Sequence, residues 1–240
     1  MTDYDPRIVD LYDVDNPDGP DHDYYRALAD ATNALSIVDL GCGTGLLTVT
    51  FARRGCRVIG ADPSAAMIAY ARNRSGAEHV EWVHGDSSAV PAGPHDLAVM
   101  TGNVAQHIPD GAWQRTLADL ASVLRPGAVL AFESRNPDVR AWEQWATEVA
   151  SSRQTMHGEL REREEITEIE PGVVEMLAHN EFVETGDRFV ERMVLTFRSR
   201  EAIERELQSA GFEMRAVYGG WRSEPFEADS KIMVFEAVRS

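Results

Sequence analysis

Apolar residues along this chain occur in short runs that alternate with segments of helical character. Five runs rich in Val, Ile, Leu and Ala have the length of buried strands, and they cover residues 35–40, 57–62, 79–86, 95–102 and 128–134. Helices are predicted for residues 44–55, 62–74 and 110–124, and one more near Asp23–Ala31. This alternation predicts parallel strands joined by right-handed crossovers, and therefore a doubly wound α/β sheet.

The pattern changes after the fifth predicted strand. Residues 156–198 contain turn signals at 170–172 and 185–187, and the segment RFVERMVLTFR places Phe189, Met193, Leu195 and Phe197 in one alternating phase. This region is predicted to form a three-stranded antiparallel meander. A helix at 199–211 and two strands at 212–220 and 231–239 then follow.

These patterns divide the chain into three parts. Residues 1–34 form an N-terminal lead-in that we expect to cover the site. Residues 35–150 and 199–240 form the α/β domain. Residues 151–198 form an antiparallel insertion, which we expect to act as a lid or a dimer contact, so a homodimer is possible.

Composition narrows the class of partner. The formal net charge is −17 and no long basic run is present, which disfavours nucleic acid as a substrate. No stretch approaches 18 consecutive apolar residues and the start of the chain is acidic, so neither a membrane span nor a secretory signal is predicted. Cys42 and Cys56 show no disulfide or zinc spacing, which favours the cytoplasm, and no metal site is indicated.

The segment VDLGCGTG, residues 38–45, runs from a strand into a glycine-rich turn that opens a helix. Glycines let the backbone turn sharply and approach a ligand closely, at the sheet edge where α/β folds bind ligands. The spacing G-x-G-x-G differs from the dinucleotide motif G-x-G-x-x-G, and the lysine of a P-loop is absent. Asp62 ends the next strand, where a carboxylate can accept hydrogen bonds from both hydroxyls of a ribose. Asp86 ends the third strand, where it can accept a hydrogen bond from the amino group of an adenine.

Taken together, these motifs resemble those of the class I S-adenosylmethionine-dependent methyltransferases. The resemblance rests on VDLGCGTG, on VIGAD followed by PSAAMIAYAR, on VHGD, on HDLAVMTGNVAQHI and on LRPGAVL, and it covers about residues 35–134. It implies a seven-stranded, mostly parallel sheet whose last strand is antiparallel. It also implies S-adenosylmethionine as the cofactor and S-adenosylhomocysteine as its product.

The resemblance assigns roles to residues at the methionine end of the cofactor. Gly41, Gly43 and the backbone of Cys42 would line the amino-acid end. Asp39 would act near the ammonium group through a water or a backbone amide, and Asn103 would lie near the sulfonium.

At the other end of the cofactor, Asp62 would hold the ribose hydroxyls, and Pro63 follows it at a helix start. Met67 would pack on the adenine, and Asp86 with the Ser87 backbone would read the adenine edge. Without the resemblance, Asp62 could equally cap a helix, Asp86 could equally lie in a turn, and Met67 could equally pack in the core.

Methyl transfer from a sulfonium is an in-line displacement that needs alignment, exclusion of water and, for some acceptors, removal of a proton. His107 is the candidate base, because an ordinary imidazole titrates near neutrality. Candidates for contact with the substrate lie in the lead-in and after the fourth and fifth strands: Tyr12, His22, Tyr25, His107, Arg135 and Trp142. Each also suits an ordinary packing role, and for Arg135 the alternative is an ion pair.

The sequence favours a small-molecule acceptor with an O, N or C nucleophile. The Asn/Asp-Pro-Pro-aromatic motif of enzymes that methylate base amino groups is absent, since the chain reads TGNV there, and neither cysteine suits cytosine C5 chemistry. Two alternatives stay open. One is a protein that binds the cofactor without transferring a methyl group. The other is a nicotinamide-dependent oxidoreductase, although no tyrosine has a lysine four residues further on.

Overall fold

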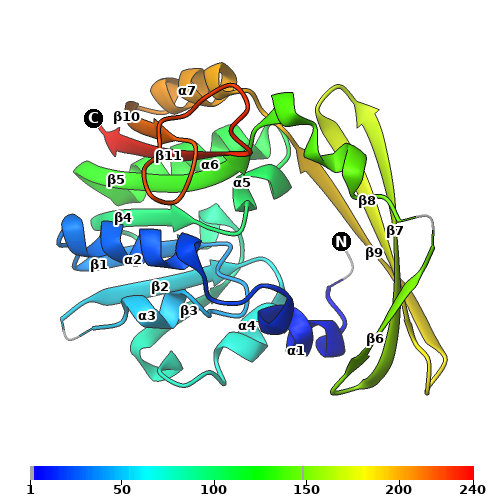
Figure 1. Cartoon of the computed structure of the whole chain (residues 1–240). Coiled ribbons are helices and arrows are strands. Elements are labelled where there is room, and N and C mark those ends of the chain that lie inside the picture. Colours follow the sequence, from blue (N-terminus) through cyan, green and yellow to red (C-terminus); the bar gives the residue numbers. More distant parts are fainter. Residues whose placement is uncertain (1–2, 54, 148) are drawn as a thin grey trace.

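The computed structural model describes residues 3–53, 55–147 and 149–240, and it contains two β-sheets (Figure 1). The first has seven strands in the order β10-β11-β5-β4-β1-β2-β3. The bounds of its strands are β1 Ser36–Leu40, β2 Arg57–Asp62, β3 Val80–His84, β4 His95–Met100, β5 Leu124–Arg135, β10 Phe212–Tyr218 and β11 Ile232–Arg239. Strands β1 to β5 pair in parallel, and β11 is antiparallel to both of its neighbours. The predicted doubly wound sheet with an antiparallel last strand is confirmed.

Helices cover both faces of this sheet because successive strand residues point to opposite sides. On one face, Trp113 of α6 and Ile203 of α7 pack with Phe132. On the other, Tyr25 of α2 and Phe51 of α3 pack with the opposite side chains of the strands. The α-helices are α1 Pro6–Asp15, α2 Pro20–Ala31, α3 Thr48–Phe51, α4 Ala65–Ala71, α5 Val104–His107, α6 Ala112–Val123 and α7 Arg200–Ser209. Short 3₁₀ turns are η1 Ala77–His79, η2 Ser87–Ala89, η3 Pro137–Val139 and η4 Ala141–Gln144.

The second sheet has four antiparallel strands in the order β6-β7-β8-β9, not the three predicted. They are β6 Ser151–Thr155, β7 Gly158–Glu170, β8 Val173–Phe182 and β9 Asp187–Thr196. The prediction missed β6 because its sequence, SSRQT, has no apolar alternation. Pairing with β7 holds this strand, and such pairing has no signal in the strand itself.

The lead-in and two of the helices also differ from the prediction. The lead-in forms two helices, and the missed α1 carries a start signal in Asp5 and Pro6, because the Asp5 side chain accepts from Arg7 N. The helices predicted at 44–55 and 62–74 are shorter, as α3 and α4. Strand β5 begins directly after α6, at Leu124. None of the described helices is long and apolar enough to cross a membrane.

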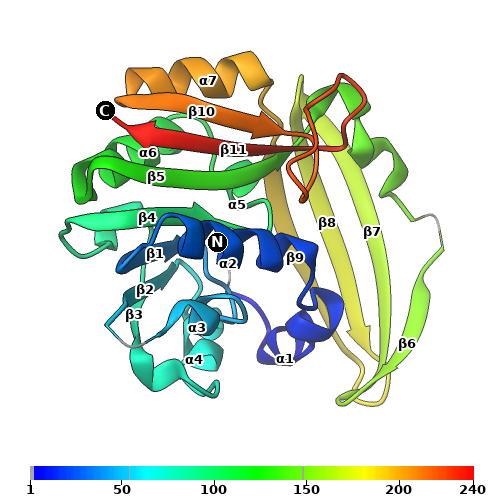
Figure 2. The same ribbon diagram turned by 60° about the vertical axis from the view of Figure 1, so that its left-hand side comes forward.

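The second sheet and α1 stand opposite the carboxyl ends of the parallel strands (Figure 2). Arg7 of α1 donates to Asp187 of the second sheet at 2.8 Å. Arg198, which follows β9, donates to the carbonyl of Ile108 after α5 at 2.7 Å. These contacts hold the second sheet across the edge where the glycine-rich turn lies. The boundaries of the three parts of the chain remain predictions.

Candidate active site

The glycine-rich turn follows β1 directly, and a close neighbour requires glycine at position 41. Gly41 and Gly43 have φ angles of +78° and +53°, in the left-handed region that favours glycine. A β-carbon on Gly41 would lie 2.3 Å from Cγ2 of Val104 in α5. A β-carbon on Gly43 would lie 3.8 Å from the ring of Tyr12. The predicted turn therefore meets both the loop after β4 and the lead-in helix α1.

Asp62 ends β2 beside this turn. Its Oδ2 accepts a hydrogen bond from Gly43 N at 2.9 Å, and its Oδ1 accepts from Ser64 N at 2.8 Å. Burial raises the pKa of Asp62 above its ordinary value, although both hydrogen bonds lower it. Each carboxylate oxygen retains a second lone pair, so the side chain can still accept from hydroxyl groups.

Asp39 ends β1 almost completely buried, with 1% of its surface exposed. Thr48 Oγ1 donates to its Oδ2 at 2.6 Å, whereas its Oδ1 has no hydrogen-bond partner among the described residues. Burial and the negative charges of Asp62 and Glu133 raise the pKa of Asp39 to about 7, although the hydrogen bond from Thr48 lowers it. A buried acceptor without a donor is costly and suggests a ligand that brings one.

The candidates on the adenosine side are placed differently from one another. Met67 of α4 is buried, and Pro63 is exposed just before this helix. Ser87 is buried, and its hydroxyl donates to Asp119 at 2.7 Å. The Asp86 carboxylate accepts from Ser88 and lies 3.0 Å from Arg115, which lowers its pKa. Asp86 is therefore a cap of η2 with an exposed carboxylate, and a role in reading an adenine stays a prediction.

The loop after β4 has a strained residue at its end. Asn103 adopts φ +61°, which is uncommon for a residue other than glycine. Its backbone N–H donates to Glu133 Oε1, and its own Oδ1 is buried without a partner among the described residues. Strain of this kind persists where the surroundings fix it, often at functional sites.

Glu133 is a residue of this region to which the sequence analysis gave no role. It is 2% exposed at the end of β5, and Tyr25 donates to its Oε2 at 2.5 Å. Burial raises the pKa of Glu133 to about 7, although the hydrogen bonds from Tyr25 and Asn103 lower it. The available signal was an acid in the otherwise apolar segment AVLAFES. Tyr25 is completely buried and orients Glu133, and its contact with substrate stays a prediction.

His107 and Arg135 lie close together at the ends of α5 and β5. The His107 side chain is exposed, yet burial by surrounding protein and the charge of Arg135 lower its pKa to about 4. A side chain that is both accessible to solvent and surrounded by protein lines a concave surface. At neutral pH the imidazole is therefore uncharged and only a weak base.

The lead-in lies over the site. The Asp13 carboxylate accepts from Thr44 Oγ1 at 2.5 Å and from Arg74, which also donates to the Thr44 carbonyl at 2.9 Å. This network places Tyr12 over Gly43. Burial, with the nearby Tyr12, Glu191 and Asp62, raises the pKa of Tyr4 to about 12.

Three further candidates require comment. Trp142 is 4% exposed in a cluster with Val174 and Phe197, and its contact with substrate stays a prediction. The His22 side chain is largely covered in the lead-in, where it lies 2.9 Å from Asp18, and its contact with substrate stays a prediction. The analysis missed Glu191 on β9, whose Oε1 is buried without a described partner and whose pKa is raised to about 6 by burial.

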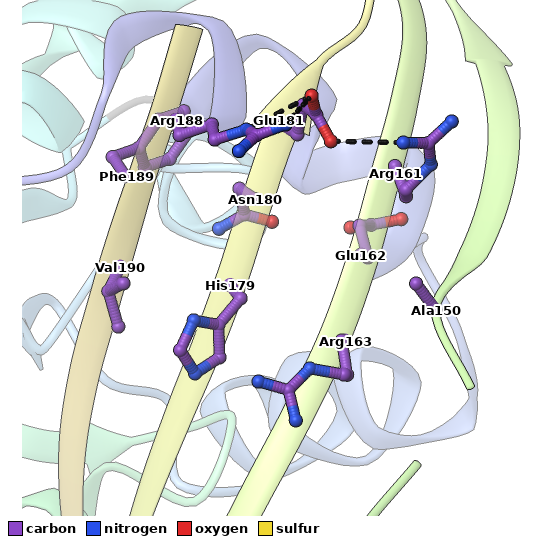
Figure 3. A pocket seen from close by; sticks show the side chains of 10 residues that line it. All are labelled: Ala150, Arg161, Glu162, Arg163, His179, Asn180, Glu181, Arg188, Phe189 and Val190. Atoms are coloured by element: carbon purple, nitrogen blue, oxygen red, sulfur yellow. Dashed lines mark hydrogen bonds and ion pairs between the residues drawn. The ribbon is translucent and has the colours of Figure 1, made fainter. Parts of the chain in front are cut away.

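A separate pocket of about 270 Å³ lies on the second sheet, lined only by residues 150–190 (Figure 3). In it, Glu181 accepts from Arg161 at 3.1 Å and from Arg188 at 2.7 Å. Because these charges pair with one another within the sheet and the lining residues all belong to 150–190, the pocket is a solvated sheet face rather than a part of the site at the glycine-rich turn.

Comparison with known proteins agrees with this geometry. Residues 37–127 match the family model described as a methyltransferase domain. Over 110 residues the chain is 42% identical to trans-aconitate 2-methyltransferase from Azoarcus sp. (strain BH72), a match that covers 44% of this chain and 42% of that protein. The chain thus spans less than half the length of this curated relative.

Solved structures resemble the whole chain. An S-adenosylmethionine-dependent methyltransferase from Clostridium acetobutylicum ATCC 824 aligns with a TM-score of 0.79 at 16% identity, over 97% of this chain and 98% of that one. The amino pentose methyltransferase CalS10 from Micromonospora echinaspora, solved with S-adenosylmethionine bound, aligns with a TM-score of 0.70 at 21% identity, over 100% and 99% of the two chains. The resemblance seen in the motifs is confirmed: residues 37–127 match the model of a methyltransferase domain, and the chain has the fold of the S-adenosylmethionine-dependent methyltransferases.

Proposed function

We propose that this protein transfers a methyl group from S-adenosylmethionine to a small-molecule nucleophile. The methyl group and the leaving group belong to the cofactor, whose sulfonium makes the methyl electrophilic. The protein has to bind the cofactor, align the acceptor and exclude water.

The observation that carries this proposal is the pair of unsatisfied acceptors beside the glycine-rich turn. Asp39 Oδ1 and Asn103 Oδ1 are buried without a donor among the described residues, at the ends of β1 and β4. These two strands are neighbours in the sheet. S-adenosylmethionine carries an ammonium, whose N–H groups can donate, and a sulfonium, which adds a second positive charge, against a single carboxylate. It therefore supplies hydrogen-bond donors and net positive charge to this acidic edge.

The other residues fit the remaining parts of the cofactor. The backbone of Gly41, Cys42 and Gly43 would lie along its amino-acid end, since no side chain of a glycine obstructs approach. Asp62 would accept from the ribose hydroxyls through the lone pairs that Gly43 N and Ser64 N leave free. Met67 and Pro63 would border the adenine, with Asp86 and Ser87 at its edge.

On the acceptor side, α1 and the second sheet would exclude water from the reaction. Tyr12 and His107 would line the space for the acceptor, and the neutral His107 would accept a proton only from a strongly activated nucleophile. Two similar proteins, a trans-aconitate and an amino pentose methyltransferase, have small-molecule acceptors in their names. The cytoplasm remains the expected location.

Calorimetric titration with S-adenosylmethionine, S-adenosylhomocysteine and NAD tests this proposal. We expect both sulfur ligands to bind and NAD not to bind. Asp62→Ala should abolish binding, whereas Asp30→Ala, at an exposed carboxylate paired with Arg53, should leave it unchanged. Binding of NAD alone would favour the oxidoreductase. Binding without any labelled methyl product, over a broad panel of acceptors, would favour the protein that binds the cofactor without using it.

A further inference from the structure

Arg135 stands at the carboxyl end of β5 without an acidic partner. The chain has 40 acidic residues against 23 basic ones, so an arginine that is partly buried ordinarily finds a carboxylate. Within the described ranges, no carboxylate lies within 4.0 Å of the Arg135 guanidinium. The ion pair that the sequence made the main alternative for Arg135 is therefore not found there.

Two neighbours hold the side chain in place without neutralising it. Gln106 Oε1 accepts from Arg135 N at 3.2 Å and from Nη1 at 3.3 Å. The guanidinium carbon lies 4.9 Å from the centre of the Trp145 ring. With Nη1 on Gln106, the Nε and Nη2 groups of Arg135 have no acceptor among the described residues, and these two N–H groups have the spacing of a carboxylate.

The nearest described acid cannot compensate this charge by contact. The field of Glu133 raises the pKa of Arg135, while burial, the larger effect, lowers it. The two oxygens of Glu133 accept from Tyr25 and from Asn103 N, and neither forms an ion pair with the Arg135 guanidinium within the described ranges. The cation is thus desolvated and fixed, with unused donors, and a charge in this condition is costly unless a ligand pairs with it.

The position of this charge relates it to the acceptor. His107 lies close enough for Arg135 to lower its pKa, and it lines the same concave surface while uncharged. We propose that the methyl acceptor carries a carboxylate, which Arg135 binds through its free guanidinium edge beside His107. This inference rests on the proposed function, because it takes the surface around His107 as the acceptor site.

The test uses the complete chain saturated with S-adenosylhomocysteine. Succinate and citrate serve as carboxylate probes, succinamide as the uncharged analogue of succinate, inorganic phosphate as another anion, and glucosamine as an amine. We expect the two carboxylates to bind, measured by calorimetry or by changes in the tryptophan fluorescence, and succinamide and glucosamine not to bind.

Arg135→Gln should weaken carboxylate binding by about tenfold or more. Arg135→Lys keeps the positive charge but lacks the paired N–H groups of a guanidinium, so it should lose part of the affinity for carboxylates. Arg57→Gln is the matched control, because Arg57 lies at the amino end of β2, opposite the carboxyl ends that carry the site, and pairs with Glu81. It should bind succinate as the native protein does.

Affinity for S-adenosylhomocysteine separates the possible failures. If the native protein does not bind this ligand, the proposed function fails. If it binds this ligand, three results would show that the inference about the carboxylate is wrong. Neither succinate nor citrate binds, or phosphate or glucosamine binds more tightly than they do, or Arg135→Gln binds succinate as well as the native protein does.

Discussion

Gly41 and Val104 are so close that a β-carbon at position 41 would lie 2.3 Å from Cγ2 of Val104. This contact joins the turn after β1 to the helix α5 after β4, although 63 residues separate the two positions in the sequence. The glycine is therefore required by its backbone angle of +78° and also by the packing of the loop that carries Asn103.

Gly41→Ala should disturb both the turn and α5. Left-handed strain costs about 1 kcal/mol and overpacking a further 1–3 kcal/mol, so we expect the free energy of unfolding to fall by about 2–4 kcal/mol. Urea unfolding measures this loss, and titration with S-adenosylhomocysteine should show weakened binding.

Gly186→Ala is the control for this prediction. Its φ is +74°, and no described atom beyond its chain neighbours lies within 4 Å of the added β-carbon, so only the strain of about 1 kcal/mol should remain. Adding Val104→Ala to Gly41→Ala should restore part of the stability. Equal losses for Gly41→Ala and Gly186→Ala would contradict a role for the close contact.

Features with local causes could be predicted from the sequence, and features that depend on distant residues could not. The turn at Gly41 and the acid at Asp62 were predictable, because a strand, a glycine spacing and a strand end are local patterns. The pairing of Tyr25 with Glu133 was not, because the two residues are 108 positions apart and neither carries a sign of its partner. Whether Arg135 forms an ion pair was not predictable for the same reason: only tertiary structure decides whether a charge is paired.

The network around Asp13 predicts how the lead-in controls access to the site. Asp13 accepts from Thr44 and Arg74, and so fixes α1 on the glycine-rich turn. A charge-assisted hydrogen bond contributes about 1.5–3 kcal/mol, so Asp13→Asn should speed dissociation of S-adenosylhomocysteine by about tenfold. Stopped-flow displacement measures this rate. Asp15→Asn, on the same helix but paired with Arg153, should leave the rate close to native; equal acceleration by both variants would count against a specific role of Asp13.

The raised pKa of Asp39 predicts a pH dependence of stability. Its ordinary value is 3.8 and its value in the fold is about 7, so the folded protein holds this proton more tightly than the unfolded chain. The contribution of Asp39 to the free energy of unfolding is therefore fully present below about pH 4 and is lost as the pH rises toward 7. Asp39→Asn imitates the neutral form and should make the ligand-free protein more stable than native at about pH 8, with little difference only at about pH 3.5.

Ligand binding supplies a second measurement at Asp39. A cation bound beside this carboxylate favours its charged form, so binding of S-adenosylmethionine near neutral pH should release a proton. Calorimetry in two buffers of different ionisation enthalpy measures that release, which Asp39→Asn should reduce. Asp30→Asn, at an exposed site, should change neither the pH dependence nor the proton release. An unchanged release in Asp39→Asn would assign the proton to Glu133, which also has a pKa raised to about 7.

The chain of hydrogen bonds from Tyr25 through Glu133 to Asn103 predicts coupling between the lead-in and the loop after β4. Tyr25→Phe and Glu133→Gln each break a buried hydrogen bond and should each weaken binding of S-adenosylhomocysteine several-fold. Because both act through the same carboxylate, the double variant should lose less than the product of the single effects. Calorimetry on the four proteins gives this coupling, and simple additivity would show that the two contacts are independent.

Asn103→Gly separates positioning from strain at the end of this chain. Glycine relieves the cost of φ +61°, so the variant should unfold at the same urea concentration as native or higher, but it removes the unpartnered Oδ1. Its affinity for S-adenosylhomocysteine should fall. Asn33→Gly relieves a similar φ of +50° at the end of α2 and should not alter that affinity. A loss of affinity in both variants would point to general loosening of the fold.

His107 should remain uncharged through the range in which an exposed histidine ordinarily titrates. Its pKa is lowered to about 4 by burial and by Arg135, against an ordinary value of 6.5. The ring signals of His107 in NMR spectra, assigned by comparison with His107→Gln, should therefore stay constant from about pH 8 to 5.5 and move only below. Arg135→Gln removes the positive charge but not the burial, so it should raise the midpoint only in part. A midpoint near 6.5 in the native protein would restore His107 as an ordinary base and would remove the evidence that it lines an enclosed surface beside Arg135.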